Sequence, residues 1–576
     1  MQNLAKLTLV LLSLVVLFWP GIQHHWEVAR DPYFVPFDAK QYIPAFFKFD
    51  PNDPIPTTYL KEYFLNAVCP PLYKASLILG ARFADVRHFQ LAMMYLTYGF
   101  FVGVMGRLGW LLGGAVLSFA VMAFTITAWI FVGLGFIGGA PRMYGYPLMA
   151  VVLYALVRDH PRALGLTAVL GALLYPIISV FAGFCLVGWL FLPLYAKDGI
   201  VSSWSLRQRL ATLVLVGALS VTALVPLFRG SEAYGRRIVA ADVVNYPESG
   251  ADGNYRAYDQ LPYQLFGKEW LSFYLGPLYS HGDPIISALN IHHNTASENS
   301  LYVLIGTGII FMLVIFAGIR LLLKDISGMG HRLIGFFAVA IVLHVLAWMG
   351  APYFYIPTRY FMFSLPFLIT LVLPWSVYLL VHRTFEQTFS HRLRNTAFLS
   401  FVALYLAAFG GRGNVDFASA TTVEKPLRPL FDKIATLPKD ALIAGWPYGI
   451  IQNVEYISRR NVFLAADLHQ TLHLNFTRVL RERMNAVFDA YLGTDAAPLN
   501  RLRREFGVTH ILVDSRHFTD PKHAPEYFAP WRDAIKPRLD QIKNRAYLMR
   551  RSLHEEAAVF NQNGLILLDL TKVPQS

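Results

Sequence analysis

Long apolar runs fill the first 411 residues of the chain, and polar segments separate them. Several runs reach the length of about 20 residues that a helix needs to cross a bilayer. The pattern predicts eleven spans, at 4–22, 88–107, 110–136, 143–157, 163–178, 179–196, 209–228, 299–322, 332–350, 358–381 and 394–411. Residues 1–411 are therefore expected to form the transmembrane region of a polytopic α-helical membrane protein.

The polar segments predict the rest of the organisation. Two long loops, 23–87 and 229–298, interrupt the spans, and a third polar region covers 412–576. In that last region the apolar runs 441–445, 461–465, 510–514 and 565–570 are typical of buried strands, whereas 474–492 and 497–506 have helical periodicity. We therefore expect a C-terminal α/β domain after the membrane region.

Positive charge sets the expected orientation. Among the short loops, Lys and Arg gather in alternate ones, on the side of Lys6, as in cytoplasmic loops, whereas the opposing short loops carry little more than Arg142 and Arg359. The loop residues on the side of Lys6 are Arg107, Arg158, Arg162, Lys197, Arg207, Arg209, Arg320, Lys324, Arg332, Arg383, Arg392 and Arg394. The N-terminus should then be cytoplasmic, and both long loops and the C-terminal domain should be extracytoplasmic. The net charge of +13 is explained by this asymmetry and does not indicate a nucleic-acid partner.

The first long loop contains the candidate acids. Asp31 precedes Pro32, which is typical of a solvated turn, whereas Asp38 is flanked by Phe37 and Tyr42, whose rings could shield it and raise its basicity. Asp38 is thus the first candidate for a catalytic carboxylate and Asp31 the second. Lys40 and Tyr42 belong to the same segment and are further candidates for binding a donor.

Arg142 and Arg359 are isolated cations at the outer ends of spans, each among Tyr, Pro and Gly residues. Arginine binds phosphate through two parallel hydrogen bonds, so both are candidates for phosphate binding. The alternative is an interfacial arginine that reaches out of the membrane beside aromatic rings. Because both lie on the side of the acidic loop, phosphate binding is the preferred interpretation.

Other motifs carry weaker predictions. Adjacent His292 and His293 point in different directions and lack a spaced third ligand, so an interfacial role is favoured over a metal site. The segment Gly445-Trp446-Pro447-Tyr448-Gly449 follows a predicted strand but is too short and proline-bound for a nucleotide loop. The two cysteines, Cys69 and Cys185, give no disulfide framework and no metal cluster.

The layout resembles the GT-C superfamily of integral-membrane glycosyltransferases, in its poorly characterised bacterial branch. The matching features are a cytoplasmic N-terminus, a long acidic first outer loop, many spans and an outer C-terminal α/β domain. Gly139-Ala140-Pro141-Arg142 and Leu174-Tyr175-Pro176 resemble recurring elements of that group.

The resemblance implies inverting transfer of a sugar from a polyprenyl-phosphate donor, on the outer face of a bacterial inner membrane. The acceptor would be a glycan, a lipid or a protein, and an acid of the first loop would be the base, here Asp38 and then Asp31. The family's Asp-x-Asp pair is absent because these acids are seven residues apart. No cofactor is therefore assigned, and a divalent metal stays open.

Two other classes compete with this interpretation. His293-Asn294 ahead of the segment 300–308 is similar to an element of O-antigen ligases, which use a polyprenyl-diphosphate glycan, so His293 marks an alternative site. A transporter or a non-catalytic assembly subunit is the second rival. Transporters place ionisable residues within spans, and the predicted spans are nearly free of them apart from His344.

Overall fold

The computed structural model describes most of the chain. The described residues are 23, 26–36, 38–127, 136, 139–192, 204–250, 316–317, 320, 329–350, 358–406, 420–468, 470–542 and 546–574. The predicted span 4–22, nearly all of the predicted span 299–322 and the alternative site residue His293 lie outside them.

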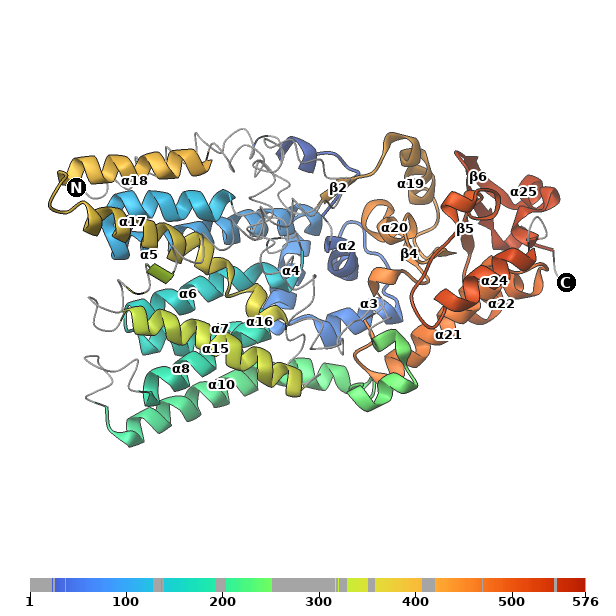
Figure 1. The fold of residues 1–576 in the computed structure, drawn as a ribbon. Coiled ribbons are helices and arrows are strands. Elements are labelled where there is room, and N and C mark those ends of the chain that lie inside the picture. Colours follow the sequence, from blue (N-terminus) through green and yellow to red (C-terminus); the bar gives the residue numbers. More distant parts are fainter. Residues whose placement is uncertain are drawn as a thin grey trace.

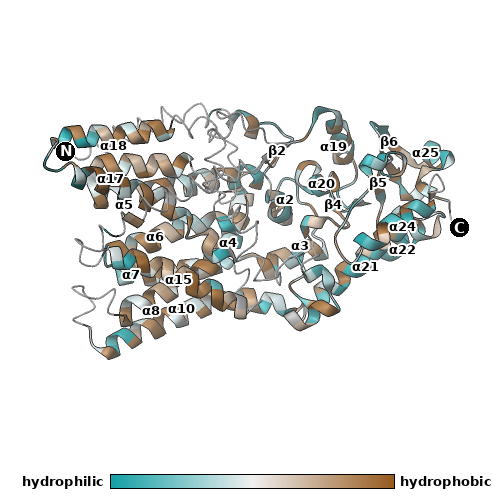
Figure 2. Cartoon of the chain, in the orientation of Figure 1, coloured by the Kyte–Doolittle hydropathy of each residue, from teal (hydrophilic) through white to brown (hydrophobic). Residues whose placement is uncertain are grey.

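Apolar helices form one end of the molecule (Figures 1 and 2). They are α5 (Val86–Thr127), α6 (Gly145–Val157), α7 (Pro161–Leu174), α8 (Pro176–Phe191), α10 (Leu206–Glu232), α15 (Met329–Met349), α16 (Thr358–Met362), α17 (Leu373–Thr384) and α18 (His391–Tyr405). Three described stretches are long and apolar enough to cross a membrane, within α5, α10 and α15, and α7 and α8 are shorter apolar helices. The helical character of nine predicted spans is confirmed, while their number stays a prediction.

Helix α5 contains two of the predicted spans, because it breaks at Gly113 and Gly114, where Gly114 has a φ of +74°. Beyond the break the chain folds back, and the Ser118 hydroxyl donates to the Gly106 carbonyl over 2.8 Å. A Cβ atom on Gly109 would lie 2.8 Å from the Cα of Ser118. Small residues thus allow the two arms of a helical hairpin to pack closely.

The first long loop is folded into short helices between the apolar helices and the C-terminal region (Figure 1). They are α2 (Ala39–Tyr42), the 3₁₀ helix Ile43–Phe49, α3 (Tyr59–Tyr63), the π-helix Phe64–Val68 and α4 (Pro71–Phe83). Aromatic contacts hold the first loop against other segments, since the ring of Tyr63 stacks on Phe476 and meets Tyr234 edge to face.

The C-terminal region contains a five-stranded sheet in the order β4-β3-β5-β7-β6. Its strands are β3 (Leu442–Gly445), β4 (Asn461–Val462), β5 (His510–Asp514), β6 (Ala558–Gln562) and β7 (Leu565–Asp569). The first three are parallel, and β7 and β6 are antiparallel to their neighbours. The four predicted strands are confirmed, and so are the helices α21 (Leu474–Tyr491) and α22 (Ala497–Phe506).

The first loop is bound to the C-terminal region along its length. Strand β1 (Phe34–Pro36) pairs antiparallel with β2 (Ala420–Thr422). Partly or fully buried ion pairs join the same two parts: Asp31 with Arg428 at 2.6 Å, Asp50 with Arg459 at 2.7 Å and Lys61 with Glu455 at 3.1 Å. Such pairs, once buried, are costly to break one partner at a time, so they fix the position of the loop.

Candidate functional site

Asp38 lies where the first loop meets the apolar helices. It precedes helix α2 as its N-cap, and its side chain does not bond the helix backbone. The residue is only 7% exposed, and its carboxylate forms an ion pair with Arg142. Two residues that are 104 positions apart in sequence, and were singled out separately, are thus in direct contact.

Arg142 is held by a 3₁₀ turn, Pro141–Tyr144, just before α6. The preceding Gly139 has a φ of +85°, and a Cβ there would lie 3.1 Å from the Cα of Ala39. The Tyr73 hydroxyl donates to the Gly139 carbonyl. The turn thus packs closely against α2 and is hydrogen-bonded to α4, which holds the Arg142 guanidinium beside Asp38.

One nitrogen of Arg142 stands out chemically. Its Nε is buried, and no group among the described residues accepts a hydrogen bond from it. A buried donor without a partner costs roughly 1–3 kcal/mol, so such groups usually face a water or a ligand. The Arg142 guanidinium therefore binds Asp38 through Nη2, and its Nε–H is available to donate to an incoming anion.

Lys40 lies two residues after Asp38 and forms an ion pair with Asp467 at 2.9 Å. Burial raises the pKa of Asp467, the charge of Asp38 acts in the same direction, and Lys40 opposes both. Asp467 thus shares one electrostatic cluster with Asp38, Lys40 and Arg142. Asp467 is not among the residues that the sequence predicted for the site.

Arg359 reaches the same neighbourhood from α16. Its Nη1 contacts the Met362 sulfur at 3.3 Å, and the Tyr146 hydroxyl donates to the Met362 carbonyl over 2.9 Å. The side chain of Tyr146 is within electrostatic range of both Arg142 and Arg359. The two predicted phosphate ligands thus lie within electrostatic range of one buried tyrosine.

The remaining candidates have structural positions. Asp31 pairs with Arg428 and accepts from the Tyr33 amide at 2.9 Å. It is therefore one of the contacts that hold the first loop to the C-terminal region, and it is not part of the Asp38 cluster. The Tyr42 ring is buried and meets Phe64 edge to face, which makes it part of the packing.

A metal role receives no support from side-chain clustering. In the part of the chain that the structure describes, no three His, Cys, Asp or Glu residues converge as metal ligands do. Asp38 and Asp467 are the two acids of the cluster, and each faces a cation. The arrangement suits recognition of an anion beside a carboxylate.

Comparison with known proteins gives matches among solved structures alone, since no family model and no curated protein matches. ArnT from Cupriavidus metallidurans in the apo state is 16% identical, with 98% of this chain and 99% of that chain covered and a TM-score of 0.44. The same protein bound to undecaprenyl phosphate gives a TM-score of 0.43 at the same identity and coverage.

The archaeal oligosaccharyltransferase AglB from Archaeoglobus fulgidus, in complex with an inhibitory peptide and a dolichol-phosphate, is 11% identical. The match covers 90% of this chain and 70% of that chain, with a TM-score of 0.49. With TM-scores under 0.5, these likenesses carry no argument about the chain, and its chemistry has to come from its own residues.

Proposed function

We propose that the chain is an inverting membrane glycosyltransferase that moves a sugar from a polyprenyl-phosphate donor to an acceptor on the outer face. The buried pair of Asp38 and Arg142 carries this proposal. It joins a carboxylate able to accept a proton to a cation able to bind phosphate, where helix α2 of the first loop meets the turn before α6.

The reaction requires one base and cations near the leaving group. The acceptor hydroxyl gives its proton to Asp38 while its oxygen attacks the anomeric carbon of the donor. The bond from that carbon to the phosphate oxygen breaks, and the polyprenyl phosphate leaves with the electron pair. Arg142 and Arg359 stabilise the negative charge that develops on the phosphate. A single displacement of this kind inverts the anomeric centre.

The ion pair also suggests how binding of the donor could release the base Asp38 from Arg142. A phosphate can accept two parallel hydrogen bonds from the Arg142 guanidinium, and the buried Nε, which has no acceptor among the described residues, would donate one of them. Once the guanidinium turns toward the phosphate, the Asp38 carboxylate is free to accept a proton. The base is thereby exposed when a donor is bound, which limits unproductive chemistry in the empty protein.

The test is transfer by the purified protein in nanodiscs, with a polyprenyl-phosphate sugar and candidate acceptors. Asp38→Asn should lower turnover by about 10²–10⁴-fold, because the amide cannot accept the proton. The variant should still fold, because the Asn oxygen can accept from Arg142, but its unfolding temperature should be lower since the charge partner of Arg142 is lost. Turnover of a polyprenyl-diphosphate glycan alone, dependent on His293 and not on Asp38, would favour the O-antigen-ligase alternative.

A further inference from the structure

The sheet of the C-terminal region has a crevice that the Asp38 cluster does not use. Strand β3 lies between β4 and β5, and all three are parallel. The chain leaves β3 toward β4 through α20 (Ile451–Ser458) and later crosses to β5 on the other side. The loops after β3 and β5 therefore diverge, and ligands of parallel sheets bind at such points.

A cavity of about 220 Å³ occupies that crevice. Trp446 and Tyr448 follow β3 on one side, and Asp514, Arg516 and His517 line the other. Tyr448 is 64% exposed, whereas Trp446 is buried. An exposed ring beside a buried one offers aromatic faces to the C–H groups of a ligand.

The polar groups of the crevice are fixed and balanced in charge. Arg516 binds Asp514 through two hydrogen bonds of 2.8 and 2.7 Å. The Tyr491 hydroxyl accepts from the Asp514 amide at 2.9 Å and lies 2.9 Å from His517 Nδ1. Burial lowers the pKa of His517 to about 4, so it is neutral at pH 7. Paired charges and a neutral imidazole favour a neutral, hydroxyl-rich ligand over an ion.

A second cavity adjoins the crevice on the side of the β1–β2 ribbon. Ile450 and Arg516 also line this second cavity of about 340 Å³, which extends to Thr422. Thr422 pairs with Phe34 in the β1–β2 ribbon, four residues before Asp38. Helix α20, whose first residue lines the crevice, packs against α2, the helix that Asp38 precedes. The two cavities share the lining residues Ile450 and Arg516, and together they are called the groove below.

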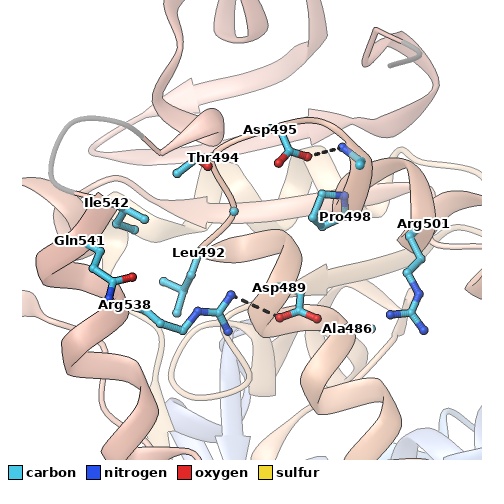
Figure 3. A pocket seen from close by; sticks show the side chains of 12 residues that line it. Ala486, Asp489, Leu492, Thr494, Asp495, Pro498, Arg501, Arg538, Gln541 and Ile542 are labelled. Atoms are coloured by element: carbon cyan, nitrogen blue, oxygen red, sulfur yellow. Dashed lines mark hydrogen bonds and ion pairs between the residues drawn. The ribbon is translucent and has the colours of Figure 1, made fainter.

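We propose that this groove binds a neutral oligosaccharide, and that it holds the glycan part of an acceptor whose reacting end lies toward Asp38. The acceptor role rests on the proposed function, whereas glycan binding in the groove does not. A larger cavity of about 640 Å³ between α21, α22 and α24 (Arg532–Ile542) is the natural comparison (Figure 3). None of the described residues that line it is aromatic, so it lacks a stacking face for a sugar ring.

The experiment probes a printed array of neutral and acidic oligosaccharides with the full chain in fluorescent nanodiscs. The strongest binder is then titrated by calorimetry. Neutral glycans should bind, and Tyr448→Ala should weaken binding about 10-fold because the exposed ring is lost. Tyr448→Phe keeps the ring and should stay within about 2-fold. Arg501→Ala, in the comparison cavity, should leave binding unchanged.

A transfer assay on the same parent preparation separates binding from transfer. A parent that binds glycans through Tyr448 but transfers no sugar would remove the proposed function and leave the groove as a glycan site. The groove assignment is overturned if no neutral glycan binds, if acidic glycans or peptides bind instead, or if Arg501→Ala loses binding while Tyr448→Ala keeps it.

Discussion

At the scale of single residues, Arg142 connects the two halves of the proposed chemistry. Its guanidinium holds the Asp38 carboxylate, and its buried Nε has no acceptor in the described part of the chain. Lysine could keep the charge at this position, but it cannot bond a carboxylate and a phosphate through one rigid fork. The geometry of the guanidinium, and not its charge alone, should therefore matter.

Arg142→Lys and Arg142→Ala test this point. We expect Arg142→Ala to lower kcat/KM for the donor by about 10²-fold or more, and Arg142→Lys to recover only part of the loss. Steady-state transfer kinetics with varied donor would measure both. If the lysine variant works as well as the parent, simple charge suffices and the fork has no role.

His473 gives a prediction on pH. Burial lowers its pKa to about 4, and its Nδ1 lies 2.9 Å from the Tyr63 hydroxyl. The unfolded chain, with an ordinary value near 6.5, binds the proton first. The contribution of the neutral, buried His473 to the free energy of unfolding should therefore be fully present above about pH 6.5 and be lost as the pH falls toward 4. His517 shifts the same way and adds to the loss.

Thermal unfolding followed by tryptophan fluorescence between pH 7.5 and 5 would show a falling midpoint. His473→Gln removes one titrating group, so its midpoint should depend less steeply on pH than that of the parent. An equal slope in the two proteins would mean that the buried histidine does not control this dependence.

At the scale of elements, Arg459 connects the first loop to the sheet. It binds the Asp50 carboxylate at 2.7 Å and the Asp53 carbonyl at 2.9 Å, and its guanidinium lies over the Phe47 ring at 4.6 Å. Three interactions from one largely buried side chain hold the segment that follows α2. The position of Asp38 depends on these contacts of Arg459.

Arg459→Ala should destabilise the contact by about 2–4 kcal/mol, since it leaves a buried carboxylate without its partner. Hydrogen exchange should become faster across residues 43–58, and transfer should fall with it. Arg551→Ala is the matched control, because the Arg551–Glu555 pair lies on an exposed helix surface and should contribute little. Equal effects of the two substitutions would contradict this role for Arg459.

Periodic elements were predictable, and pairings between distant segments were not. Helices α21 and α22 appear almost where the amphipathic pattern placed them, because their burial follows from a local period. The break between α7 and α8 lies at Tyr175 and Pro176 and not after residue 178, since proline starts the second helix. Strand β1 has three residues and no local period, so its pairing with β2 could not be foreseen.

The same distinction applies to the candidate site. Asp38, Arg142 and Arg359 were selected because an isolated charge at a membrane boundary is unusual. Asp467 was not, since an acid in a polar region is unremarkable until the fold buries it beside Lys40. Asp31 resembled Asp38 in sequence, and only its contact with Arg428 separates their roles.

At the scale of the whole molecule, the predicted topology places the C-terminal region outside the cytoplasm. Cys69 and Cys185 are both buried, so native thiols give little background in a labelling experiment. A cysteine introduced as Arg551→Cys, at a side chain that is 89% exposed, should react with an impermeant maleimide in intact spheroplasts. Labelling that requires permeabilised cells would reverse the assigned orientation.

The pairing of β1 with β2 has a consequence for the timing of synthesis. Phe34 and Thr422 are 388 residues apart (422 minus 34). At about 5–20 residues per second, a ribosome needs on the order of 20–80 s to make the partner strand after the first one has emerged. Throughout that interval the first loop lacks its sheet contact, and Lys40 has no Asp467 to bind. A nascent chain therefore cannot assemble the complete cluster before its membrane helices have been made, so activity should appear only late in biogenesis.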